Sequence, residues 1–291
     1  MMRMKNFKDM PEEDLMLELL SGSKGCLNVG NLSIHPYTLQ EIKDYGYSNY
    51  MLNLQWLSLT VDDFIKSVLD IEKRVYLEAE KSKLKTFDFY IKLGGEQMLD
   101  GLLVALAMIF KTDDVRVLGD SAIAVDFVKN GVLFEDENGE IITDEDRLEE
   151  LDESEIKIIT RDNFDDIVEA VKLQNYLKKP DKIKNDEMNP ADEETRKLME
   201  RMKELNEKVE EKKRQQKKAY GEDEEINISD IVSAVTTKSN SINKLNVWDH
   251  TLYQLYDEYA RLELIDNYDF SIRAMMAGAE KIDLKHWSSK I

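Results

Sequence analysis

The sequence predicts an α+β fold that is mostly helical, with a small antiparallel β portion in the middle, a long charged helical linker and a C-terminal helical module. Apolar residues recur at steps of three and four through both ends of the chain, whereas they alternate between Asp114 and Ile142. They become scarce from Lys178 to Glu225. We therefore expect an N-terminal helical region (1–84), an α+β unit with a β-hairpin (85–177), a charged linker or exposed helix (178–225) and the C-terminal module (226–291).

Composition limits the possible function classes. Of 291 residues, 42% are hydrophobic, which supports a core, and 60 acidic residues outnumber 40 basic ones. The net charge of −20 argues against a general nucleic-acid binder, because such proteins neutralise phosphates with Lys and Arg. The single cysteine, Cys26, excludes an internal disulfide and a Cys-based zinc site. We expect no secretory signal, because the first fifteen residues have no apolar core and turn acidic at once. We expect no membrane partner, since the longest apolar run, Leu102–Phe110, is too short to cross a bilayer.

Helix signals dominate the N-terminal region. A helix is predicted after Pro11, because three acids follow it and favour the positive end of the helix dipole. Ser21–Asn31 holds three glycines and predicts a flexible connector, since its Gly-Ser-Lys-Gly core lacks the spacing of a phosphate-binding loop. Thr38 is a candidate N-cap for the next helix. Asp62–Glu80 predicts a further helix that begins with acids.

The central region contains both apolar patterns, the alternation of strands and the three- and four-residue spacing of helices. Phe87–Ile91 alternates like a strand, and Glu96–Phe110 predicts a helix that is buried on most faces. An Asn-Gly pair at 138–139 between apolar runs predicts a hairpin. The segment also imitates a calcium loop, but Phe134 would occupy the first ligand position and cannot coordinate calcium. Glu155–Thr160 predicts another strand, and Asp162 or Asn163 then caps a helix.

The linker leaves several structures open. Ala191–Ala219 is nearly all Glu, Lys, Arg and Gln, with four apolar residues at heptad spacing over about two repeats. Three structures fit this composition: a coiled coil that allows self-association through 191–219, a lone solvated helix, or a segment ordered only on binding. We favour the exposed charged helix. The basic run Lys212–Lys218 is a candidate contact to nucleic acid, but a solvated helix end explains it better because acids flank it.

The C-terminal module is rich in aromatic residues. Asn227 or Ser229 is expected to cap its first helix and Asn246 its second, while Asp269–Ala279 predicts a short third helix. The tail, Lys281–Ile291, is too apolar to be free and is expected to lie on the body. Aromatic residues at helical spacing usually belong to a core. Tyrosine and tryptophan are nevertheless favoured as anchors for a protein partner, and the candidates for that role are Trp248, Tyr253, Tyr256 and Trp287.

Residues suited to catalysis or metal binding do not cluster in the sequence. His35, His250 and His286 are scattered, so we expect no metal ion and no cofactor. Solvated acids explain Asp144–Glu155 better than paired acid–base chemistry does. We therefore expect a protein that is not an enzyme and has no catalytic residues. The alternative of another class is a hydrolase or transferase that acts through carboxylates.

Two stretches resemble a known group of proteins: Asp162–Leu177, and the ending, with its Val-Trp-Asp at 247–249, Thr251–Asp257, Tyr-Asp at 268–269, Ala-Gly-Ala at 277–279 and Trp287. Together with the charged spacer, they are similar to tail morphogenesis proteins of tailed bacteriophages of Gram-positive hosts, which are often described as tail assembly chaperones. The resemblance implies a non-enzymatic protein in the host cytoplasm that binds a tail component such as the tape-measure protein. The alternative is a permanent structural component of the virion tail or neck.

Overall fold

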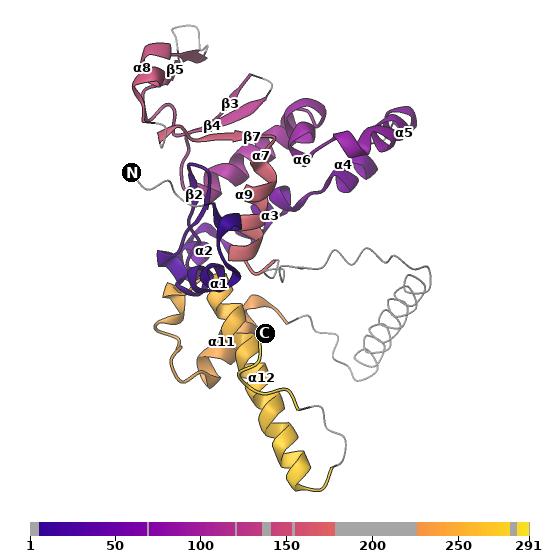
Figure 1. Cartoon of the computed structure of the whole chain (residues 1–291), viewed down its shortest axis with the longest axis vertical. Helices are drawn as coiled ribbons and strands as arrows, with labels where there is room; N and C mark the ends of the chain where they lie inside the picture. Colours follow the sequence, from indigo (N-terminus) through magenta and orange to yellow (C-terminus); the bar gives the residue numbers. More distant parts are fainter. Residues whose placement is uncertain are drawn as a thin grey trace.

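The computed structural model describes residues 6–68, 70–119, 121–135, 141–152, 155–177, 226–279 and 284–290 (Figure 1). Within these ranges the fold is α+β and mostly helical, with three small antiparallel sheets, which confirms the predicted fold class. The predicted linker lies outside the described residues. The same holds for the heptad segment 191–219 with its possible self-association, and for the basic run Lys212–Lys218. The division into four regions stays a prediction.

The predicted first helix is confirmed as α1 (Glu12–Leu20), which follows a short 3-10 turn, η1 (Phe7–Asp9). The predicted connector after it is wrong in part. It contains the 3-10 turn η2 (Gly22–Lys24) and strand β1 (Leu27–Val29), which pairs antiparallel with β2 (Leu32–Ile34). The four apolar side chains of these strands alternate with polar ones and are buried, so a two-residue period hidden among glycines produced a hairpin.

Four helices continue the N-terminal region: α2 (Leu39–Tyr45), α3 (Tyr47–Ser58), α4 (Val61–Ser67) and α5 (Ile71–Glu80), followed by a 3-10 turn, η3 (Lys81–Lys83). Thr38 caps α2 in a full capping box, as predicted. The single helix predicted over Asp62–Glu80 is wrong, because the chain is extended at Val68 and Asp70 and Asp70 starts a new helix as its N-cap.

The strand predicted at Phe87–Ile91 is also wrong. This segment forms α6 (Thr86–Asp88) and a π-helical turn, η4 (Phe89–Leu93), ahead of the confirmed helix α7 (Glu96–Ile109). The reason is aromatic packing. Phe89 stacks on Phe64 with ring centroids 5.1 Å apart, while Phe87 and Tyr90 contact Phe164 at 5.4 and 5.9 Å. All three side chains are buried, which an alternating strand with one solvent face does not allow.

The central sheets follow the predicted two-residue period. Strands β3 (Val115–Leu118), β4 (Ala122–Val125) and β7 (Ile158–Thr160) form one antiparallel sheet in that order. Strands β5 (Leu133–Glu135) and β6 (Ile141–Thr143) pair antiparallel, which confirms the hairpin, although its Asn-Gly pair lies outside the described residues. Two helices complete this region, α8 (Glu145–Glu150) and α9 (Phe164–Gln174), the latter beginning after Asn163 as predicted.

The C-terminal part contains α11 (Ile228–Lys238), a 3-10 turn η6 (Val247–Asp249) and α12 (Leu252–Met276). Asn227 caps α11, as predicted. The second helix begins after Thr251 and not after Asn246, and the predicted third helix is wrong, because α12 continues unbroken through 25 residues. No glycine or proline interrupts that stretch. The tail lies against α12, where the Arg261 guanidinium donates to the carbonyl oxygens of Trp287 and Ser289 at 2.8 Å.

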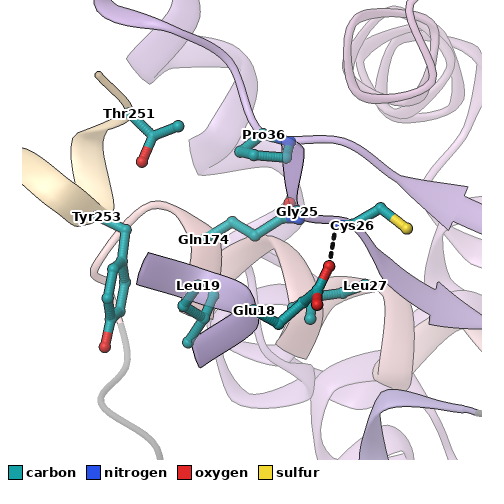
Figure 2. Close-up of a pocket in the computed structure, with 9 residues that line it drawn as sticks. All are labelled: Glu18, Leu19, Gly25, Cys26, Leu27, Pro36, Gln174, Thr251 and Tyr253. Atoms are coloured by element: carbon teal, nitrogen blue, oxygen red, sulfur yellow. Dashed lines mark hydrogen bonds between the residues drawn. The ribbon is translucent and has the colours of Figure 1, made fainter. Parts of the chain in front are cut away.

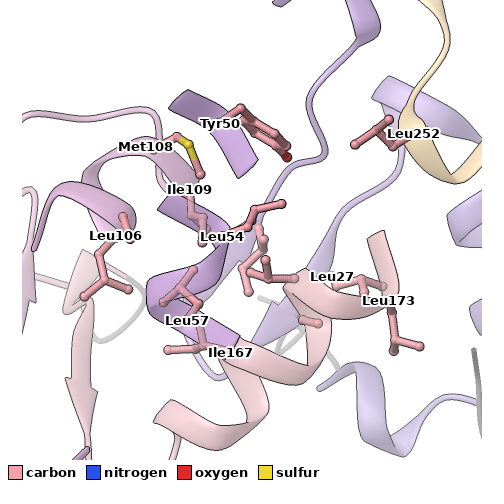
Figure 3. Packing of buried hydrophobic residues seen from close by; sticks show 14 of the residues in the cluster. Leu27, Tyr50, Leu54, Leu57, Leu106, Met108, Ile109, Ile167, Leu173 and Leu252 are labelled. Carbon is pink, nitrogen blue, oxygen red and sulfur yellow. The ribbon is translucent and has the colours of Figure 1, made fainter. Parts of the chain in front are cut away.

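One cluster of buried side chains connects the N-terminal, central and C-terminal elements (Figure 3). It runs from Phe7 to Leu255 and includes Leu27 of β1, Leu106 of α7 and Leu252 of α12. A second, small cluster around Phe127 supports the β5–β6 hairpin. None of the helices that the structure describes combines the length and the apolar character of a membrane span.

Candidate protein-docking surface

The base of α12 is fixed to the N-terminal region through two threonine caps. Thr251 is 1% exposed, and its hydroxyl accepts from the Gln254 amide while the Gln254 side chain accepts from the Thr251 amide. Thr38 forms an isolated antiparallel bridge with Thr251, and Leu39 N donates to His250 O at 2.7 Å. The starts of α2 and α12 therefore lie side by side, and the direction of the C-terminal helix is set by backbone hydrogen bonds.

Two of the four predicted anchors pack inside the protein. Tyr256 stacks on Tyr176 with centroids 5.4 Å apart, and Tyr253 meets the edge of Tyr176 at 5.5 Å. Tyr253 is buried, and its hydroxyl lies 3.5 Å from the sulfur of Met16. Burial raises the pKa of both Tyr253 and Tyr256, so both remain neutral at physiological pH. Their observed contacts are intramolecular, and their role toward a partner stays a prediction.

The two tryptophans differ in exposure. Trp248 is half-buried, donates from Nε1 to Lys244 O at 3.1 Å, and has the Lys43 ammonium 5.1 Å from its ring centre. Trp287 is 48% exposed, and its carbonyl is held by Arg261. The neighbouring His286 ring contacts Tyr268 of α12 at 5.3 Å. The structure thus presents the Trp287 ring on an ordered tail. We name α12 together with residues 284–290 the C-terminal arm.

The far end of the arm carries apolar side chains that the sequence analysis did not single out. Phe270 is 73% exposed and Met276 is 84% exposed, whereas Leu252 at the other end of the same helix is buried. In Figure 1 this end of α12 projects away from the other described elements. The signal in the sequence was weak, because Phe270 and Met276 share the helical periodicity of core residues.

Titratable groups suited to chemistry are dispersed. Among the residues that the structure describes, no group of three His, Cys, Asp or Glu side chains is placed to hold a metal ion. His250 and His286 make local hydrogen bonds, to Asn246 O and to the Ser288 hydroxyl. His35 lines an open hollow of about 330 Å³ together with Ser23, Ser33 and the Glu41–Lys111 ion pair and their neighbours.

A polar cluster beside β4 was missed from the sequence. Asp126 accepts from Lys157 Nζ at 2.9 Å and from the Thr112 hydroxyl at 2.7 Å, with Lys129 Nζ 3.3 Å away. Burial alone would raise the pKa of Asp126, but the contacts with Lys157 and Thr112 bring it below its ordinary value. Asp114 is 6% exposed, and it accepts from the Lys129 amide through one oxygen. The two ammonium groups neutralise Asp126, so this cluster suits fold stabilisation better than proton transfer.

A small cavity lies where the N-terminal, central and C-terminal segments meet (Figure 2). It measures about 10 Å³ and is lined by Cys26, Glu18, Gln174 and Tyr253, among others. The Cys26 amide donates to the Glu18 carboxylate at 2.8 Å, and burial raises the pKa of the Cys26 thiol. A space of this size holds about one water molecule, so it suits no substrate.

Comparison with known proteins concerns the same C-terminal part of the chain. Residues 213–291 match a family model described as the YomV second domain, from a phage-type protein of a Bacillus prophage region. No curated protein and no solved structure matches the chain. Within the described residues, the match includes α11, α12 and the tail. The part of the chain that forms the C-terminal arm is therefore similar to a phage-associated domain.

Proposed function

We propose that this protein is a non-enzymatic tail morphogenesis protein of a phage, acting as an assembly chaperone that binds a tail component such as the tape-measure protein through its C-terminal arm. The observation that carries the proposal is Trp287, a residue that is 48% exposed and whose backbone carbonyl accepts from Arg261. A tryptophan fixed in place loses little conformational entropy on binding and is a frequent hot spot. The similarity of this part of the chain to a phage-associated domain supports a role in a phage.

The charge of the whole chain indicates the kind of segment that the arm binds. The arm itself is nearly neutral, because the five acidic residues of α12 are offset by Arg261, Arg273, Lys285 and Lys290, whereas the whole chain has a net charge of −20. A partner segment with basic residues around apolar ones would therefore be attracted to the chain as a whole and held by Trp287. Host cytoplasm during assembly is the proposed location, because a chaperone acts before its client enters the particle.

The proposal is tested by producing the tape-measure protein of the same phage together with the chain and measuring how much client stays soluble and copurifies. Trp287→Ala should weaken capture about thirtyfold, the effect of losing a hot spot worth about 2 kcal/mol. Phe134→Ala is a matched control, since Phe134 is an aromatic residue with 47% exposure on strand β5. Capture by Trp287→Ala at full strength would refute the assignment.

A second measurement separates a chaperone from a permanent tail component. Purified phage particles are probed for the chain with an antibody. A chaperone is released before the particle is complete, so it should be absent, whereas a structural component of the tail or neck is present at a fixed ratio to the other tail proteins. Presence at a fixed ratio would overturn the chaperone assignment.

A further inference from the structure

An apolar groove of about 730 Å³ opens between α4, α5 and the π-helical turn η4. The stacked rings of Phe64 and Phe89 contribute to its lining, as do Leu77 and Met98. Helix α5 forms one wall although none of its described side chains is buried. A helix of ten residues is marginal in water by itself, so a partner in the groove would stabilise it. The volume is in the range of ligand-binding sites.

The rim of this groove carries charges that are free within the described ranges. Lys73 and Lys92 line it and form no ion pair there, and Glu72 is likewise unpaired. Asp70 is engaged as the N-cap of α5, where it accepts from two backbone amides. Within the described residues, the groove therefore offers an apolar floor, two lysines that form no ion pair and two carboxylates, Glu72 and the capping Asp70.

The far end of the C-terminal arm carries charged and apolar side chains that complement those of the groove. At 100° per residue, Asp269, Phe270, Arg273 and Met276 share one face of α12 that is about 120° wide. All four side chains are exposed. The carboxyl end of a helix also carries partial negative charge, which favours neighbouring cations. Asp269 and the helix end match Lys73 and Lys92, and Arg273 matches Glu72.

A chain cannot place this end in its own groove. Leu255 is fully buried near the start of α12, and a straight helix reaches about 30 Å from there to Met276. In Figure 1, α5 and the far end of α12 lie at opposite ends of the described structure. Only another copy can bring the two surfaces together.

We propose that the far end of α12 of one copy, with Phe270 and Met276 as anchors, docks in the α4–α5 groove of a second copy, head to tail. The contact joins two different surfaces, so the pair as a whole keeps one free groove and one free helix end, and addition of copies continues until a ring closes or an open chain forms. The inference is independent of the proposed function, which rests on Trp287 of the tail.

The test uses two full-length double variants at exposed positions. The groove variant is Tyr76→Glu with Leu93→Glu, at residues 68% and 50% exposed, and the tip variant is Phe270→Glu with Met276→Glu. The control is Leu17→Glu with Val104→Glu, at 66% and 51% exposure. Circular dichroism melting verifies folding of each. Sedimentation velocity over a range of concentrations measures the assembly state of each protein and of a one-to-one mixture of the groove and tip variants.

Wild type and the control should form species larger than a monomer as concentration rises, and each double variant alone should stay monomeric. The mixture should form a dimer and nothing larger, because only one intact groove and one intact helix end can meet. A wild type that stays monomeric, a variant that still assembles alone, or a mixture that stays monomeric or grows beyond a dimer would overturn the proposal. Client capture by Trp287→Ala is measured separately, so a failure here leaves the proposed function untouched.

Discussion

Truncation of Leu255 tests whether the C-terminal helix and the rest of the chain share one core. Leu255 is fully buried and belongs to the same cluster as Leu27 of β1 and Ile42 of α2. Leu255→Ala removes the buried part of the side chain and leaves a cavity, which costs about 3 kcal/mol of unfolding free energy within a typical range of about 2–5 kcal/mol. With an m-value of about 3 kcal/mol per molar urea, the unfolding midpoint falls by about 1 M.

The assay follows urea unfolding with two fluorescence reporters. In one background Trp56 of α3 is the single tryptophan, and in the other Trp248 of η6 is, with Phe at the remaining tryptophan positions. Both midpoints should fall equally, because unfolding of one shared core is cooperative. Leu245→Ala is the control, since Leu245 is 90% exposed and its loss should cost less than about 0.5 kcal/mol. A Trp56 midpoint that does not move while the Trp248 midpoint falls would refute the shared core.

Three further changes test local parts of the fold by urea unfolding. Thr251→Ala removes the N-cap of α12 and should cost about 1 kcal/mol more than Thr251→Ser, which keeps the hydroxyl; equal costs would contradict the cap. The pKa of Asp126 is lowered in the folded state, so the stability it contributes is present at neutral pH and is lost as pH falls below its ordinary pKa of 3.8. The Asp126→Asn variant should therefore lose less free energy of unfolding than the wild type between pH 5 and about 2, and an equal loss in the two proteins would refute this. Gly101→Ala should destabilise α7 despite the better helix propensity of alanine, because the added Cβ would lie 2.6 Å from the Trp56 ring; a stabilised variant would show that this ring moves at little cost.

Much of the fold follows from signals a few residues apart. Thr38 and Asn227 cap helices as the sequence predicts, since a cap depends only on a side chain and the amides two or three residues later. Phe87–Ile91 was predicted wrongly because its alternation would suit a strand, whereas contacts with Phe64 and Phe164, distant in the chain, decide for helical turns. Asn246 is the cap that the sequence predicts for the long helix, but the helix begins after Thr251, which forms a capping box with Gln254 and a bridge to the distant Thr38.

For the candidate site too, local sequence signals could predict some features, and contacts between distant segments decided the others. The residue types of Trp248, Tyr253, Tyr256 and Trp287 identified aromatic residues suited to a partner, but their exposure could not be predicted. Tyr253 lies against Met16, 237 residues earlier, while Trp287 is 48% exposed. The groove beside α5 was not predicted either, because it needs the interruption at Val68–Asp70 and the turn η4 together.

The sequence by itself determined the negative charge, the predominance of helices and the caps at Thr38, Asn163 and Asn227, since each depends on composition or on neighbours within one turn. The tertiary structure alone decided which aromatic side chains face a neighbour and which face water. Burial depends on segments that meet across the whole chain, such as the starts of α2 and α12, and no local pattern specifies those meetings.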